Sequence, residues 1–124
     1  MEKIVLDTNI LIEILKGNQL IIKKLEESDF IFYISSITVM ELYYGAFNKK
    51  ELLKLQKFVS LFNILNLNSE VSKISTKLIF TYAKSHNLTI PDSLIASCAI
   101  ENNFKLLTLN LKDFKYISEL VLLK

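Results

Sequence analysis

Residues 3–17 of the chain read KIVLDTNILIEILKG, and this stretch predicts a short buried strand that passes directly into a helix. The run from Lys3 to Asp7 is apolar up to its acidic last residue. After it, apolar residues recur at helical spacing until Gly17, which ends the pattern. The apolar residues of this helix are Ile10, Leu11, Ile14 and Leu15.

The alternation of apolar strand runs with amphipathic helices continues along the whole chain. Helical crossovers between parallel strands are right-handed and place helices on both faces of the sheet. We therefore expect a three-layer α/β/α sandwich with a central, mainly parallel sheet of four or five strands. Further helices are expected at 18–28, 39–47, 50–62, 69–86 and 92–102, and further strands at 30–35, 64–67, 104–109 and 120–123.

Composition places the chain among ordered globular proteins. Its 124 residues, of which 51% are hydrophobic and 23% charged, are typical of one domain, here residues 1–124. One cysteine, Cys98, and one histidine, His86, exclude an internal disulfide and a zinc site built from these residue types. We expect Cys98 in the core, His86 at the surface, and a cytoplasmic protein without a signal peptide or membrane span.

The charges set limits on the partners. All fifteen basic residues are lysine, and the net charge is +2, which neither requires nor repels a polyanion. Without arginine the chain has no guanidinium group for bidentate contacts to bases, which argues against sequence-specific reading of duplex nucleic acid. The high apolar content, with a mean hydropathy of +0.33, suggests that another chain covers part of the surface.

Three acidic residues, Asp7, Glu41 and Asp92, lie in otherwise uncharged neighbourhoods. Each has a structural explanation: Asp7 can cap the helix that follows it, Glu41 can form a capping box with Thr38, and Asp92 favours the positive end of a helix dipole. Asp7 and Glu41 also follow strand ends, where ligands of parallel sheets collect. Carboxylates gathered there would bind divalent cations or take up protons. The pattern alone does not place Asp92 beside the other two.

The chain contains, in this order, the segments DTNILIEIL, SSITVMELYYGA, PDSLIASCAIENNFKLLTLN and KDFKYI. Together, over essentially all 124 residues, they resemble the PIN domains of VapC-type ribonuclease toxins. The resemblance implies that Asp7, Glu41 and Asp92 meet at one edge of the sheet, hold Mg²⁺ or Mn²⁺ and hydrolyse RNA phosphodiester bonds. It also implies a homodimer and a cognate antitoxin protein that blocks the acidic pocket.

A fourth acid often follows the last core strand in that family, and the matching position here is Asn110, with Asp113 three residues later. An asparagine carbonyl can still bind a hard cation, so we expect Asn110 to have a supporting role. Asp113 either binds through water or is a turn residue. Thr8, Asn9 and Thr108 resemble polar neighbours of the acids, although capping and turn hydrogen bonds also explain them.

Two other functions fit parts of the pattern. A phosphoacceptor receiver-like domain also carries acids at strand ends, but it needs a pair of adjacent acids after the first strand, where DTN supplies one. A non-catalytic PIN-like module that binds RNA or protein is compatible with Asn110 in place of an acid. Cleavage of RNA that depends on a divalent cation separates these readings from a nuclease.

Overall fold

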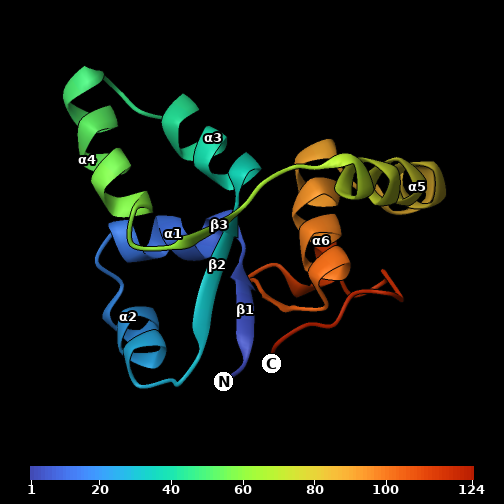
Figure 1. The fold of residues 1–124 in the computed structure, drawn as a ribbon, viewed down its shortest axis with the longest axis horizontal. Helices are drawn as coiled ribbons and strands as arrows, with labels where there is room; N and C mark the ends of the chain where they lie inside the picture. The colour runs from blue at the N-terminus through green and yellow to red at the C-terminus, as the bar shows by residue number, and fades with distance from the viewer.

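The computed structural model describes residues 1–124 and contains one sheet of four parallel strands in the order β3-β2-β1-β4 (Figure 1). The predicted three-layer α/β sandwich is confirmed. The expected strand at 120–123 does not form, and Leu122 makes only an isolated parallel bridge to Leu106. The strands are β1 (Lys3–Leu6), β2 (Ile31–Ser35), β3 (Asn63–Leu65) and β4 (Lys105–Leu107).

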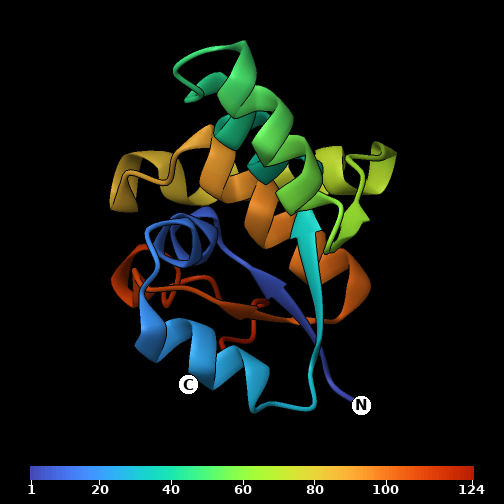
Figure 2. The same cartoon turned by 90° about the vertical axis from the view of Figure 1, so that its left-hand side faces the viewer.

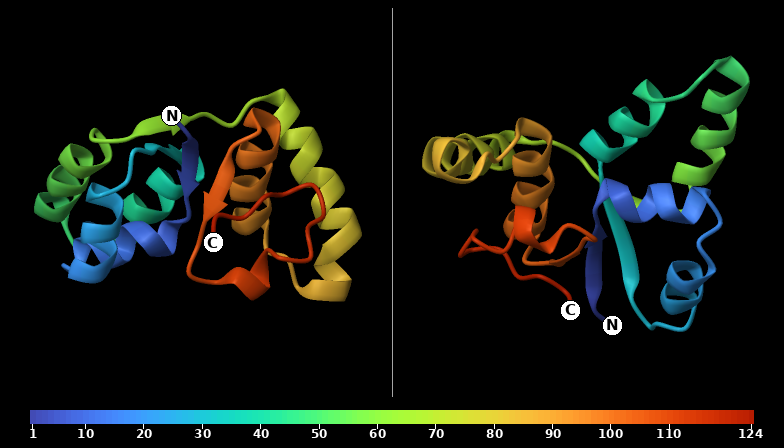
Figure 3. Two further views of the ribbon diagram at one scale, coloured as in Figure 1. Left: turned by 90° about the horizontal axis from the view of Figure 1, so that it is seen from below. Right: turned by 180° about the vertical axis from the view of Figure 1, so that it is seen from behind.

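Six α-helices surround this sheet and form its two outer layers. Helices α1 and α2 cover one face, with α3 and α4 extending beyond the carboxyl ends of the strands on the same side, and α5 and α6 cover the other face (Figures 1 and 3). Viewed from the first side, α1 and α2 lie in front of the strands (Figure 2). No helix is both long and apolar enough to cross a lipid bilayer. The helices are α1 (Thr8–Leu15), α2 (Gln19–Glu26), α3 (Ser36–Tyr44), α4 (Lys49–Val59), α5 (Ser69–His86) and α6 (Ile90–Asn102).

Strand β1 divides the hydrophobic core into two parts, because successive side chains of a strand point to opposite faces. Ile4 and Leu6 pack with α1, α3 and α4, whereas Val5 packs with α5, α6 and the C-terminal segment. All three are fully buried. A strand buried on both faces reads as a continuous apolar run, which is why the strand could be recognised from sequence.

Helix α3 begins three residues earlier than predicted. Ser35 is its N-cap, and the Ser35 hydroxyl accepts a hydrogen bond from the Ile37 amide at 3.2 Å. The predicted capping box between Thr38 and Glu41 is therefore wrong, because the N-cap is Ser35. Thr38 is the third residue of the helix and Glu41 the sixth, so both side chains are free to make other contacts.

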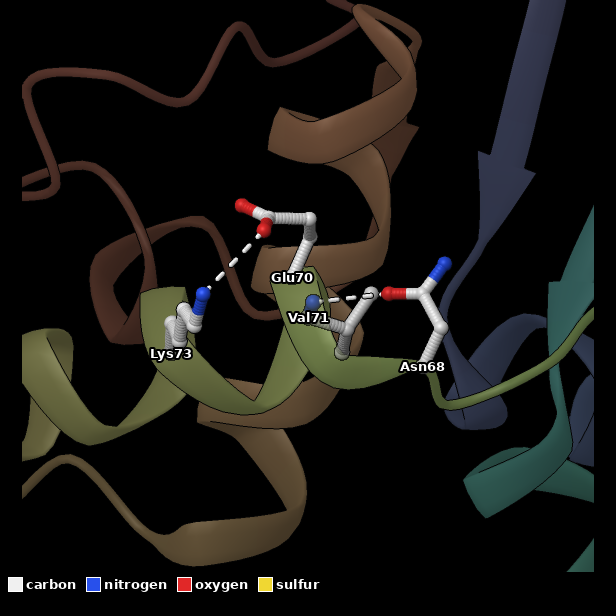
Figure 4. Close-up of polar contacts among 4 residues, drawn as sticks. All are labelled: Asn68, Glu70, Val71 and Lys73. Carbon is white, nitrogen blue, oxygen red and sulfur yellow. Dashed lines mark hydrogen bonds and ion pairs between the residues drawn. The ribbon is translucent and has the colours of Figure 1, made fainter.

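Helix α5 has the bounds that the sequence predicts, Ser69–His86, because both of its ends carry strong signals. The Asn68 carboxamide oxygen accepts from the Val71 amide at 2.9 Å, and a Lys73–Glu70 ion pair of 3.5 Å lies on the exposed first turn (Figure 4). Asn87 ends the helix in the left-handed conformation, with φ of 58°. An exposed ion pair adds little stability, so the asparagine cap is the main determinant of where the helix starts.

We expect Asn68→Ala to lower the free energy of unfolding by about 1 kcal/mol, because it leaves an amide of the first turn without its acceptor. Urea denaturation monitored by circular dichroism measures the change. Asn66→Ala is the matched control, since Asn66 is an exposed loop residue two positions earlier that makes no side-chain hydrogen bond. Equal stability of the two variants would contradict the assigned cap.

Candidate functional site

The Asp7 carboxylate lies at the junction of β1 and α1 and is only 4% exposed. Its Oδ1 accepts from the Thr8 amide at 2.8 Å, which confirms the expected helix cap. Its Oδ2 accepts from the hydroxyl of Thr108, the residue directly after the neighbouring strand β4, at 2.7 Å. Burial raises the pKa of Asp7, and these two hydrogen bonds lower it only in part. Asp7 is therefore a fixed, solvent-shielded acid.

Thr108 connects this acid to the chain that leaves β4. Its hydroxyl donates to Asp7 and accepts from the Asn9 side-chain amide at 3.4 Å and from the Asn110 backbone amide at 3.0 Å. One donated and two accepted bonds saturate a hydroxyl group. Asn9 also accepts from the Leu109 amide at 3.3 Å. Thr108 and Asn9 thus position Asp7, whereas Asn110 is held through its backbone and its side chain is exposed.

Glu41 reaches the same end of the sheet from α3. Its Oε1 accepts from the Thr8 hydroxyl at 2.8 Å, and the Thr8 and Thr38 hydroxyl oxygens are 2.9 Å apart. Because the single proton of Thr8 goes to Glu41, the buried Thr38 hydroxyl is the donor to Thr8. Thr38 was not predicted as a site residue. Its position three residues before Glu41, on the same helix face, was the available signal.

Asp92 lies in the first turn of α6, after the N-cap Thr89, whose hydroxyl accepts from the Asp92 amide at 3.3 Å. Burial, together with the charges of Asp7, Asp113 and Glu41, raises the pKa of Asp92 to about 6. Asp113 ends a short 3-10 helix, Leu111–Asp113, and is exposed. Its charge also raises the pKa of Asp7.

Four carboxylates at this end of the sheet act on one another through their charges, and we call them the acid cluster: Asp7, Glu41, Asp92 and Asp113. None of them takes part in an ion pair with a lysine. No three acidic, histidine or cysteine side chains stand close enough together to enclose a metal ion as they lie. The acid cluster is thus a region of concentrated, unneutralised negative charge that a cation or a proton would relieve.

Comparison with known proteins adds information that is independent of this geometry. The family model described as "PIN domain" matches residues 4–120. A curated relative named Ribonuclease VapC, from Rickettsia bellii, is 33% identical over 128 residues, which cover 97% of this chain and 94% of the relative.

Several solved structures also share the fold over nearly the whole chain. VapBC2 from Rickettsia felis, bound to a DNA fragment from its promoter, is 31% identical with a TM-score of 0.80, covering 98% of this chain and 97% of that one. A toxin–antitoxin complex from Klebsiella pneumoniae is 32% identical with a TM-score of 0.78, covering 94% of each chain. DNA-bound VapBC from Salmonella typhimurium is 25% identical with a TM-score of 0.84, covering 99% and 98%.

The raised pKa of Asp92 predicts how stability changes with pH. In the folded protein the Asp92 carboxyl keeps its proton up to a pH of about 6, whereas in the unfolded chain it loses the proton near pH 3.8. The free energy of unfolding therefore falls as the pH rises between these values. We expect Asp92→Asn to gain stability relative to the wild type between pH 4.5 and pH 7.5, because the amide never ionises.

Thermal or urea unfolding in EDTA at the two pH values measures this gain. Asp29→Asn, which changes an exposed carboxylate before β2 that forms no ion pair, controls for the loss of one negative charge. If the difference in free energy of unfolding between Asp92→Asn and the wild type stays constant with pH, Asp92 ionises as an ordinary surface acid.

Proposed function

The chain belongs to the PIN-domain family, in its VapC branch, and we propose that it is a divalent-metal-dependent endoribonuclease that acts as the toxin of a toxin–antitoxin pair. The observation that carries this proposal is the acid cluster, in which the charges of four carboxylates from separate parts of the chain act on one another without a basic partner. Structural charges are usually paired or solvated singly, so such a group favours a function that uses the negative charge.

The residues of the acid cluster fit a hard divalent cation such as Mg²⁺ or Mn²⁺ in chemistry and charge. Carboxylate oxygens are the ligands that these ions prefer. Asp7 is fixed by two hydrogen bonds, whereas Glu41 is exposed and Asp92 is half-buried. We propose Asp7, Glu41 and Asp92 as the ligands, with Asp113 beside them. Thr8, Asn9, Thr108 and Asn110 support them.

When bound, the metal would lower the pKa of a coordinated water and neutralise charge on the phosphate that is attacked. The chain's own groups do the positioning. Thr8 holds the Glu41 carboxylate by one oxygen and leaves the other exposed, where it can orient a water molecule. Asp7 is held in place, because each of its oxygens accepts one hydrogen bond and keeps a further lone pair for a metal ion. The one histidine, His86, is not within the acid cluster, so a pair of histidines acting as acid and base is excluded.

We propose a cognate antitoxin protein as partner, because solved relatives of this chain are described as toxin–antitoxin complexes. Large apolar side chains at the surface support a homodimer: Tyr44 is 95% exposed and Phe80 is 92% exposed. The free buried thiol of Cys98 agrees with a reducing cytoplasm as the place of action.

Asp7→Asn should abolish RNA cleavage, with a fall of about 100-fold or more, because it removes a ligand charge while the amide oxygen can still cap α1. The test incubates purified protein with a mixed RNA pool, with Mg²⁺ or with EDTA, and follows the products by gel. Asp29→Asn is the control and should cleave at the wild-type rate.

Two outcomes of that assay decide against parts of the proposal. Cleavage by Asp7→Asn at the wild-type rate would remove Asp7 from the mechanism. Binding of RNA without any cleavage, in every divalent cation tested, would support the non-catalytic PIN-like module instead.

The ends of the products report the nucleophile. Attack by water predicts a 5′-phosphate and a 3′-hydroxyl, because the ribose 2′-hydroxyl takes no part. Mass spectrometry of the fragments, or their ligation without prior phosphatase or kinase treatment, reads these ends directly. A 2′,3′-cyclic phosphate would instead show attack by the ribose.

A further inference from the structure

Three aromatic rings form a second cluster that the acids do not explain. The rings of His86 and Tyr116 are stacked, with centroids 4.1 Å apart and planes 12° apart. Tyr82, one turn before His86 on α5, meets both rings edge-on, at 5.7 Å from His86 and 5.0 Å from Tyr116. We call Tyr82, His86 and Tyr116 the aromatic cluster.

The aromatic cluster is joined to the acid cluster along two stretches of chain. His86 ends α5, and the connection from it leads within six residues to Asp92 in α6. Asp113 lies three residues before Tyr116. Burial and the charges of Asp92 and Asp113 raise the pKa of the Tyr116 phenol. The aromatic cluster thus borders the acid cluster on the Asp92 and Asp113 side.

Tyr82 and Tyr116 pack against the core, whereas His86 covers them from the outside. The C-terminal segment is already anchored by Phe114 and Ile117, which are 1% and 2% exposed and flank Tyr116 in sequence. His86 is exposed, with Tyr116 stacked against its ring, so part of the ring still meets solvent. The Ser85 hydroxyl and His86 Nδ1 are 2.7 Å apart, and this hydrogen bond fixes the rotation of the ring. His86 is therefore a flat, oriented and accessible surface.

We propose that His86, backed by Tyr116 and Tyr82, stacks against an unpaired nucleobase of single-stranded RNA whose phosphate lies at the acid cluster. The inference rests on the proposed function and adds a base-binding position to it. Unstacked RNA bases are bound in proteins by the faces of aromatic and histidine rings. Such stacking tolerates any base, because every base has a π-face. A chain without arginine depends on this kind of contact more than most.

Lysines beside the aromatic cluster in the chain are suited to the neighbouring phosphates. Lys84 and Lys115 are both exposed, and neither takes part in an ion pair. Lysine ammonium groups attract phosphates without reading sequence. Stacking and charge together favour RNA over an antitoxin segment as the occupant of this surface.

The test measures binding of a fluorescent single-stranded hexanucleotide RNA by anisotropy in Mg²⁺, using full-length protein that carries Asp7→Asn so that the RNA stays intact. Adding His86→Ala should raise the dissociation constant about tenfold, whereas His86→Phe should keep it within about twofold. Phe80→Ala removes an exposed aromatic ring from the same helix, and Tyr116→Phe keeps the backing ring. Neither should change the affinity.

A scan of hexanucleotides with one abasic position locates the stacked base. At one position, loss of the base should weaken binding to the parent protein but should cause no further loss with His86→Ala. 2-Aminopurine at that position should be quenched by the parent protein and not by His86→Ala. Equal affinity of the parent and His86→Ala would overturn the proposal. Weaker RNA binding by His86→Ala that is equally weak in His86→Phe would also overturn it. So would a loss of affinity on His86→Ala that is the same whichever position of the RNA is abasic.

The two proposals fail separately. Wild-type protein that does not cleave RNA in any divalent cation would refute the nuclease, while the binding measurements still decide whether His86 stacks on a base. Normal cleavage combined with unchanged binding by His86→Ala would refute only the stacking. If instead the antitoxin uses this surface, His86→Ala should weaken antitoxin binding and leave RNA binding unchanged, which also refutes it.

Discussion

The buried carboxylate of Asp7 is the constraint on which the carboxyl end of the sheet depends. An ionised group shielded from water is costly unless hydrogen bonds replace its hydration. Here the replacement comes from the Thr8 amide at the start of α1 and the Thr108 hydroxyl at the end of β4. The Thr8 hydroxyl extends the network to Glu41 on α3. One acid thus ties two neighbouring strands and two helices into a common geometry.

Most of the fold could be predicted because its signals are local. The strand and helix of residues 3–17 and the eighteen residues of α5 are visible from periodicity and capping residues alone. The start of α3 was placed wrongly because residues 35–38 read SSIT, in which three residues can each act as a cap. The end of β2 at Ser35 decides between them, since the chain turns into the helix there. A strand end is set by pairing with its neighbour and is therefore not visible locally.

The candidate site was predictable only in part, for a related reason. Asp7 directly follows the apolar run of β1, which made it recognisable as a candidate, and its cap on α1 was predicted. The approach of Asp92 and Asp113 depends on how α6 and the segment after β4 return to the sheet, which only tertiary contacts determine. Resemblance to a family supplied Asp92 and left two candidates for the fourth position, Asn110 and Asp113, of which Asp113 is the one whose charge acts on the other acids. His86 was expected at the surface and lies there, yet its stacking on Tyr116 had no signal in sequence.

The two edges of the sheet differ in a way that matters for solubility. Beside β4, the bridge from Leu122 to Leu106 lets the chain's own C-terminal segment cover the edge. At the opposite edge, β3 pairs only with β2 and spans just Asn63–Leu65. Open strand edges recruit further molecules into β-aggregates, and proteins counter this by keeping such strands very short. A strand of three residues offers too few backbone groups to template that growth, so this fold carries its exposed edge without an added shield.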